Sequence, residues 1–221
     1  MPRMARVVIP NYPHHVTQRG NRRQKTFFRD EDYRYYIELM SEFSVKSGTE
    51  IWAYCLMPNH VHLVMVPAEE DGLRATLGEA HRRYTRYVNF REGWRGHLWQ
   101  ERFHSFTMDE DYLLSTVRYV ERNPIVAGLC GHPEEWEWSS ASAHIKGEDD
   151  ELVLVKPMLD RIDDWGKYLS FADSSSHVEQ IKQHTRTGRP LGSMEFIRKL
   201  ETIAGIDLSL KTPGRKSIKK K

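Results

Sequence analysis

The feature that most constrains the fold of this 221-residue chain is a pair of strand-like runs separated by only two residues. Residues 50–57 and 60–66 are rich in aromatic, β-branched and other apolar side chains. Pro58-Asn59 between them is typical of a turn. The two runs are therefore close enough in sequence to form a β-hairpin.

Further strand-like and helix-like segments flank this hairpin. In chain order we expect a strand at 13–18, a helix from Asp30 to Gly48, the hairpin, a helix at 73–90, a strand at 98–107, and a helix from 109 that Pro124 ends at 122 or 123. With the last helix as an addition, this is the ferredoxin-like order. The predicted fold class is α+β: a ferredoxin-like or RRM-like antiparallel sheet with helices on its faces and a C-terminal helical extension.

The composition of the chain changes after its first two thirds. We expect a core domain over residues 1–145, a helical extension over 146–210 and a disordered basic tail over 211–221. No run of about 18 apolar residues is present, which argues against a membrane span. Cys55 and Cys130 form no CxxC pair and are expected to be ordinary thiols in a reducing cytoplasm.

Charge is unevenly distributed, although the formal net charge is only +2. Residues 109–164 carry 5 Lys/Arg against 14 Asp/Glu, whereas residues 177–221 carry 11 against 4. Basic regions of this kind favour a polyanionic partner, because each phosphate contact releases condensed counterions. Charge alone leaves open a solvated tail that only aids solubility.

His60-Val61-His62, in the second strand of the hairpin, is a candidate metal site. Strand side chains alternate between faces, so the two histidines project from the same side. Two imidazoles there can share a divalent cation and leave coordination positions for water and substrate oxygens. Their flanks are apolar, so the pair lies in a strand that we expect to be largely buried. Buried imidazoles cost free energy unless they have partners, which favours a metal ligand role. The pattern by itself also fits a polar surface pair or one satisfied core histidine.

Tyr119, in the helix predicted after residue 109, is a candidate nucleophile. Asn123 follows four residues later, which places an amide and a phenol on one helix face. Phenol is a poor nucleophile at neutral pH because its pKa is about 10, and a cation at the scissile phosphate lowers the barrier. A single Tyr on an amphipathic helix more often serves core packing, and spacing alone does not overturn that interpretation of Tyr119.

Four motifs occur in order along the chain: Pro13-His-His-Val-Thr-Gln-Arg-Gly20, Met57-Pro-Asn-His-Val-His-Leu-Val64, Leu98-Trp-Gln-Glu-Arg-Phe103 and Tyr119-Val-Glu-Arg-Asn-Pro-Ile-Val-Ala-Gly-Leu129. Taken together, they resemble the REP-associated tyrosine transposases, which are relatives of the single-tyrosine HUH (IS200-like) transposases of small insertion sequences. The resemblance covers about residues 1–145, and Gly188-Arg-Pro-Leu-Gly192 is a softer match to the extension of some members.

This resemblance implies a metal-dependent DNA transposase and endonuclease that cleaves and rejoins single-stranded DNA. It implies that His60 and His62 hold Mg²⁺ or Mn²⁺, with Asn123 completing the metal site. Tyr119 would attack a phosphodiester to give a 5′-phosphotyrosine and a free 3′-OH. The implied partners are single-stranded REP or BIME-like DNA hairpins. The implied protein is a cytoplasmic, nucleoid-associated monomer, although dimers in related enzymes leave a dimer open.

Two basic groups are candidate DNA contacts: one follows the first strand, and the other lies on the helix at 73–90, where a solvated helix face is an equal alternative. His14, His15 and His104 are weaker candidates, because a single histidine is more often structural. The candidate DNA-binding residues are Arg19, Arg22, Arg23, Lys25, Arg82, Arg83 and Arg86.

Two other functions remain open. One is a hairpin-DNA-binding regulator on the same fold with little or no transposition activity. The other is an unrelated histidine phosphoesterase acting on RNA ends or cyclic phosphates. That class usually needs two His-x-Ser/Thr motifs, whereas only His60-Val61-His62 is prominent here.

Overall fold

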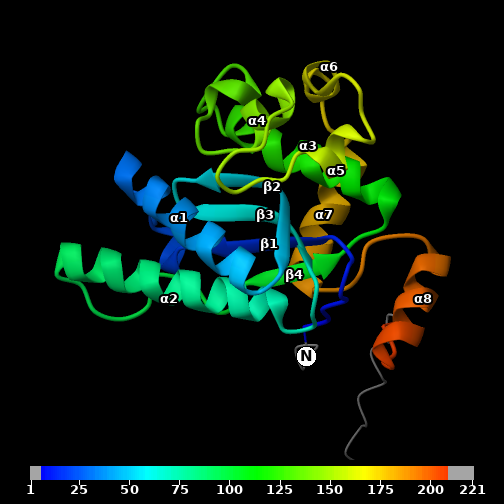
Figure 1. Cartoon of the computed structure of the whole chain (residues 1–221), viewed down its shortest axis with the longest axis horizontal. Helices are drawn as coiled ribbons and strands as arrows, with labels where there is room; N and C mark the ends of the chain where they lie inside the picture. Colours follow the sequence, from blue (N-terminus) through cyan, green and yellow to red (C-terminus); the bar gives the residue numbers. More distant parts are fainter. Residues whose placement is uncertain (1–5, 209–221) are drawn as a thin grey trace, which may run out of the picture.

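The computed structural model describes residues 6–208, so the tail predicted at 211–221 lies outside the described residues. Its four strands form one antiparallel sheet in the order β2-β3-β1-β4 (Figure 1). The predicted α+β fold class is confirmed. The strands are β1 (His14–Arg19), β2 (Thr49–Met57), β3 (His60–Pro67) and β4 (His104–Thr107).

Helices cover both faces of the sheet: α1 and α2 lie on one face, and α3 lies on the other (Figure 1). The helices of the described residues are α1 (Asp30–Lys46), α2 (Gly72–Glu92), α3 (Glu110–Val126), α4 (Ala141–Lys146), α5 (Lys156–Leu159), α6 (Trp165–Ser170), α7 (Ser175–Thr187) and α8 (Met194–Ala204), with 3₁₀ turns at Asn21–Arg23 and Pro133–Glu135.

The alternation of side chains along β3 divides this strand between two hydrophobic cores. Val61 and Leu63 pack in the core under α1 and α2, whereas Val64 packs in the core under α3. His60 and His62 share the parity of Val64, so they lie on the α3 face of the sheet. The hairpin therefore presents both imidazoles toward the helix that carries Tyr119.

Two predicted element boundaries are wrong. The strand expected over 98–107 is limited to β4, which begins only at His104. Glu101 adopts a left-handed conformation (φ 58°), and this conformation interrupts the extended backbone upstream of β4. The helix expected to end before Pro124 continues to Val126. Pro124 lies in the last turn of α3, where its missing N–H removes only one helical hydrogen bond.

The C-terminal extension packs against α3. Trp165 and Leu169 of α6 and Ile181 of α7 are buried in the same core as Val117 and Val120 of α3. The extension therefore contributes to the layer that holds the tyrosine helix. Within residues 6–208, none of the helices has the length and apolar character needed to cross a bilayer.

Glu121 of α3 is a fully buried carboxylate that connects this layer. It accepts hydrogen bonds from Ser140 Oγ (2.5 Å), His144 Nδ1 (2.6 Å) and Trp165 Nε1 (2.8 Å). A buried carboxylate is tolerated only when such donors replace its hydration. Segments far apart in sequence are thus tied to one point on α3.

His14, the first residue of β1, fixes the N-terminal segment to this strand. Its buried ring accepts the backbone N–H of Ile9 through Nε2 (3.1 Å) and donates through Nδ1 to the carbonyl of Tyr12 (2.8 Å). Burial lowers the pKa of His14 to about 4. The segment in turn packs against α8 through Val7, Ile9 and Leu200.

Replacement of Glu121 is expected to destabilise the fold strongly. Glu121→Ala leaves the buried donors of His144 and Trp165 without an acceptor, and Ser140 keeps only its longer contact with the Tyr54 carbonyl (3.3 Å), so we expect a loss of roughly 3–5 kcal/mol in the free energy of unfolding. Glu121→Gln keeps one acceptor oxygen and should lose less. Urea denaturation measures both, with the exposed Asp111→Ala on the same helix as a control that costs under about 1 kcal/mol. Equal losses for Glu121→Ala and Asp111→Ala would contradict this account.

Acidification is expected to weaken the fold through His14. Its folded-state pKa of about 4 lies below the ordinary 6.5, so the unfolded chain binds this proton first as the pH falls. Between these values the free energy of unfolding should decrease by about 1.4 kcal/mol per pH unit for this residue. Denaturant titrations at several pH values measure the slope. His14→Gln should reduce it by about one proton, and an unchanged slope would show that the ring is not buried in its neutral form.

Candidate active site

A cleft of about 670 Å³ lies on the α3 face of the sheet. It brings together side chains from β1, β3, α3, α7 and the segment before β4. Its lining residues are Thr17, Gln18, Arg19, Arg23, His60, His62, Gln100, Glu101, His104, Tyr119, Asn123, Glu179, Lys182, Thr185 and Arg186.

His60 and His62 lie side by side in this cleft, with ring centroids 4.9 Å apart and ring planes at 77°. Burial lowers the pKa of His60 to about 4, with a further contribution from Arg19. The pKa of His62 is also well below its ordinary value, first because of burial and then because of neighbouring His60 and His15. Both imidazoles are therefore neutral at pH 7, which is the form that binds metals.

The Nδ1 atoms of His60 and His62 each lie within hydrogen-bond distance of a neighbouring side chain. Nδ1 of His60 donates to Oδ1 of Asn59 (2.6 Å). Nδ1 of His62 lies 3.0 Å from Nε2 of His15, and these two rings are parallel, with centroids 5.2 Å apart. The Nε2 atom of each cleft histidine is left as the nitrogen available to a ligand.

His15 is a residue whose role the sequence did not reveal. The sequence suggested it only as a weak candidate to approach substrate, whereas the structure buries it behind His62 at 1% exposure. Burial lowers the pKa of His15 to about 3, so this ring is neutral too. Its Nδ1 has no hydrogen-bond partner within residues 6–208. Strand alternation alone places His15 on the α3 face, but its contact with His62 depends on the β1–β3 pairing.

Tyr119 projects from α3 toward the paired histidines. Its ring lies edge-on to His62 (centroids 5.6 Å) and to His15 (6.3 Å), and its side chain is partly exposed to the cleft. Burial raises the pKa of Tyr119, while Asn123 and Arg19 lower it by smaller amounts. The phenol is therefore protonated at neutral pH in the free protein. The Nδ2 atom of Asn123 donates to the Tyr119 carbonyl (2.7 Å), which leaves Oδ1 of this amide for the cleft.

The structure separates the predicted DNA-binding residues at the end of β1 and just after it. Arg19 and Arg23 line the cleft beside His60 and Tyr119. Arg22 lines a different hollow of about 330 Å³, and Lys25 is exposed outside both hollows. Their contacts with DNA remain predictions, but only Arg19 and Arg23 lie at the candidate active site.

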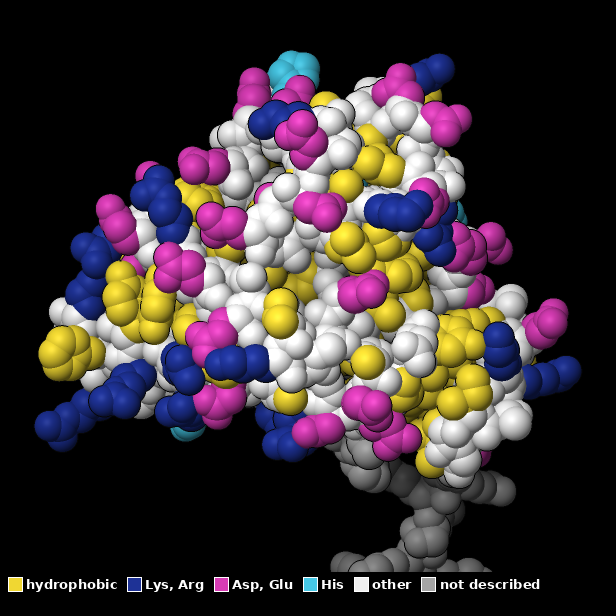
Figure 2. Space-filling view, in the orientation of Figure 1, with side chains coloured by type: hydrophobic (Ala, Val, Ile, Leu, Met, Phe, Trp, Pro, Cys, Tyr) yellow, Lys and Arg dark blue, Asp and Glu magenta, His cyan; other side chains and the backbone are white. Residues whose placement is uncertain are grey.

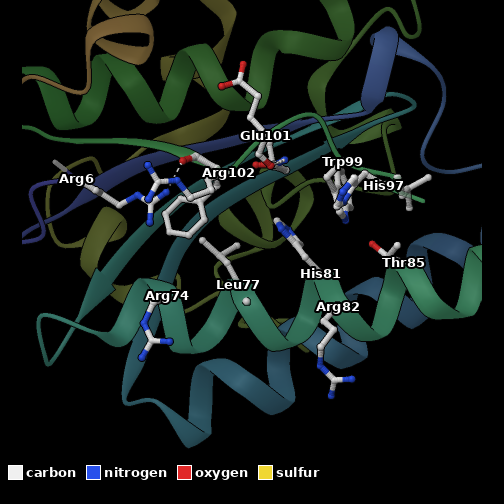
Figure 3. Close-up of a pocket in the computed structure, with 14 residues that line it drawn as sticks. Arg6, Arg74, Leu77, His81, Arg82, Thr85, His97, Trp99, Glu101 and Arg102 are labelled. Atoms are coloured by element: carbon white, nitrogen blue, oxygen red, sulfur yellow. Dashed lines mark hydrogen bonds between the residues drawn. The ribbon is translucent and has the colours of Figure 1, made fainter. Parts of the chain in front are cut away.

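The predicted arginines of α2 lie on the opposite face of the sheet. Figure 2 shows Lys and Arg side chains over α1 and α2 with acidic side chains between them, and Arg82 and Arg83 pair with Glu79 (2.7 Å) and Glu42 (3.5 Å). Arg82 also borders a second cavity of about 460 Å³. In Figure 3, however, Arg82 projects away from the sheet while His81 of the same helix projects toward it. Arg82, Arg83 and the exposed Arg86 therefore do not line the Tyr119 cleft.

Comparison with known proteins supports the resemblance first seen in the motifs. Residues 9–123 match the family described as Transposase IS200 like. A curated relative from Haemophilus influenzae, described as a REP-associated tyrosine transposase, is 25% identical over 159 residues, which cover 63% of this chain and 90% of that protein.

Solved structures show a similar fold. The structure of a REP-associated tyrosine transposase bound to a REP hairpin superimposes with a TM-score of 0.58 at 19% identity, covering 68% of this chain and 90% of that chain. A transposase structure from Deinococcus radiodurans aligns over 54% of this chain and 96% of that chain at 21% identity, with a TM-score of 0.39. Because the family match spans more than half of the sequence, the chain belongs to the IS200-like transposase family.

Proposed function

We propose that this protein is a strand transferase that cuts and rejoins single-stranded DNA hairpins in the Tyr119 cleft. The observation that carries the proposal is the Tyr119 ring at 5.6 Å from His62, in one cleft with His60 and four basic side chains. The REP hairpin bound to a protein of similar fold supports hairpin DNA as the substrate class. That the protein acts on REP-type hairpins, and that it does so as a monomer, remain predictions.

In the proposed reaction, the phenolic oxygen of Tyr119 attacks the phosphorus of a phosphodiester. An O–P bond forms and the P–O3′ bond breaks, which gives a 5′-phosphotyrosine and a 3′ end. The phenol proton passes to water in the cleft, and the leaving 3′ oxygen takes a proton from water. Because the number of phosphoester bonds is conserved, attack by a 3′-OH reseals the strand without ATP.

The residues of the cleft fit a divalent cation. His60 and His62 would hold Mg²⁺ or Mn²⁺ through Nε2, and the amide oxygen of Asn123 is the third candidate ligand. Within residues 6–208, no group of three or more His, Cys, Asp and Glu side chains forms a metal site, so water and DNA oxygens would complete the coordination. When bound, the ion supplies positive charge that polarises the phosphate and favours the phenolate. Mn²⁺ should bind imidazole nitrogen more tightly than Mg²⁺ does.

Because the pKa of Tyr119 is raised, we expect DNA and metal to bind before the phenol reacts. Without DNA and metal, burial keeps the phenol protonated, and the nucleophile is weak. Arg19 is the cation that lowers this pKa within the chain itself, and it borders the same cleft. The site therefore becomes reactive only after its ligands bind.

Replacement of the nucleophile tests the reaction directly. With a single-stranded DNA hairpin and Mn²⁺ or Mg²⁺, the wild-type protein should form a covalent adduct that survives a denaturing gel. Tyr119→Phe should abolish the adduct while hairpin affinity stays within about threefold, because the ring and its packing are retained. Tyr112→Phe on the same helix is the matched control, since Tyr112 contacts His177 and does not line the cleft. Wild-type binding without an adduct would indicate a regulator, and hydrolysis that survives Tyr119→Phe would indicate a phosphoesterase.

Replacement of His15 tests the proposed metal site. A metal on Nε2 of His62 requires its proton on Nδ1, where it donates to Nε2 of His15, so His15 positions and orients the ligand. His15→Phe should weaken Mn²⁺ binding by roughly 10- to 100-fold, measured by electron paramagnetic resonance of the free ion. His15→Gln, which keeps an acceptor, should lose less. His14→Gln, on the same strand but the opposite face, should leave Mn²⁺ affinity unchanged, and equal losses in His15→Phe and His14→Gln would refute a specific role.

A further inference from the structure

Helix α7 lies beyond the residues that match the family, yet it packs at the candidate active site. Ile181 is 1% exposed in the core under α3. The ring of His177 contacts Tyr112 of α3 (centroids 5.6 Å), and the ring of His184 contacts Phe106 of β4 (6.0 Å). These three residues follow helical spacing, so one face of α7 is anchored to the core.

A different face of α7 borders the cleft. Glu179, Lys182 and Arg186 line it at i, i+3 and i+7, together with Tyr119 and His60 from the transposase core. Lys182 is exposed, and Arg186 pairs with Glu179 at 3.4 Å, with side chains 71% and 67% exposed. An ion pair this exposed contributes little stability, so Arg186 can exchange its partner for a phosphate.

The charge of the cleft comes from both ends of the chain. Arg19 ends β1 and Arg23 follows it, while Lys182 and Arg186 belong to the C-terminal extension. A strand that reaches Tyr119 would therefore meet basic side chains from both segments. Lys and Arg contacts of this kind bind the sugar–phosphate backbone and carry little base information.

We propose that α7 is a wall of the DNA-binding cleft and that Lys182 and Arg186 bind phosphates of the single strand presented to Tyr119. This inference rests on the proposed function, because it assigns a contact to the same substrate. Glu179 opposes binding from the same wall, since its carboxylate repels phosphate. The helix adds affinity and holds the strand in place, whereas base recognition lies elsewhere.

The test is the double variant Lys182→Gln/Arg186→Gln in the full chain. Its affinity for a fluorescent DNA hairpin with a single-stranded flank should fall roughly three- to tenfold near physiological salt. An oligo-dT strand should lose a similar factor, because backbone contacts are independent of sequence. The slope of log affinity against log salt should become shallower by about 0.7 for each lost phosphate contact. Glu179→Gln should shift affinity in the opposite direction, toward tighter binding.

Two controls separate direct contact from indirect effects. Lys146→Gln/Lys167→Gln removes the same charge at exposed positions outside the cleft and should leave affinity within about twofold. Mn²⁺ affinity and thermal stability should be unchanged in Lys182→Gln/Arg186→Gln, because both side chains are exposed and contribute no metal ligand. Equal effects of the two double variants would overturn the inference, and so would tighter DNA binding by Lys182→Gln/Arg186→Gln, which would mean that α7 shields the cleft.

Failure of this inference is distinguishable from failure of the proposed function. A wild-type protein that forms no adduct but loses DNA affinity in Lys182→Gln/Arg186→Gln would refute the strand-transfer reaction and leave α7 as a DNA-binding wall. A wild-type protein that forms the adduct, with unchanged affinity and unchanged salt dependence in the variant, would refute only the role of α7.

Discussion

The buried carboxylate of Glu121 holds the tyrosine helix in place over the sheet. Three donors from other segments converge on it, and none of their bonds faces competition from bulk water. Glu121 follows Tyr119 by two residues, so the two side chains leave α3 in different directions. The network that fixes one side of the helix thereby directs Tyr119 toward His62, and the extension that supplies Trp165 helps to hold the helix that carries Tyr119.

Burial has opposite consequences for the two kinds of functional group in the cleft. It keeps the imidazoles of His60 and His62 neutral and available to a metal, because the charged form of a histidine is penalised. It also keeps Tyr119 protonated, because the charged form of a phenol is penalised in the same way. In the proposed reaction, this low-dielectric site would keep both histidines available to a metal, while Tyr119 would stay protonated until charge arrives with the substrate.

Much of the fold could be predicted because its signals are local. The hairpin follows from two β-rich runs around Pro58-Asn59. The helices follow from apolar spacing, with acidic residues at the starts of α1 and α3. The errors arose where a local rule met another constraint. Glu101 takes a left-handed conformation that interrupts a β-like sequence, and Pro124 is accommodated because it lies in the last turn of α3. The neighbouring residues predict neither the conformation of Glu101 nor the continuation of α3 past Pro124.

For the candidate site, the sequence alone determined which side chains share a face. His60 and His62 do so because strands repeat every two residues, and Tyr119 and Asn123 do so because helices repeat every 3.6. Only the tertiary structure decided that these two faces meet, that His15 lies behind His62, and that Lys182 and Arg186 border the same cleft. Local periodicity fixes the direction of a side chain relative to its own element. The distances between elements depend on strand order and helix packing, which bring together residues as far apart in the chain as His15 and His62, 47 positions.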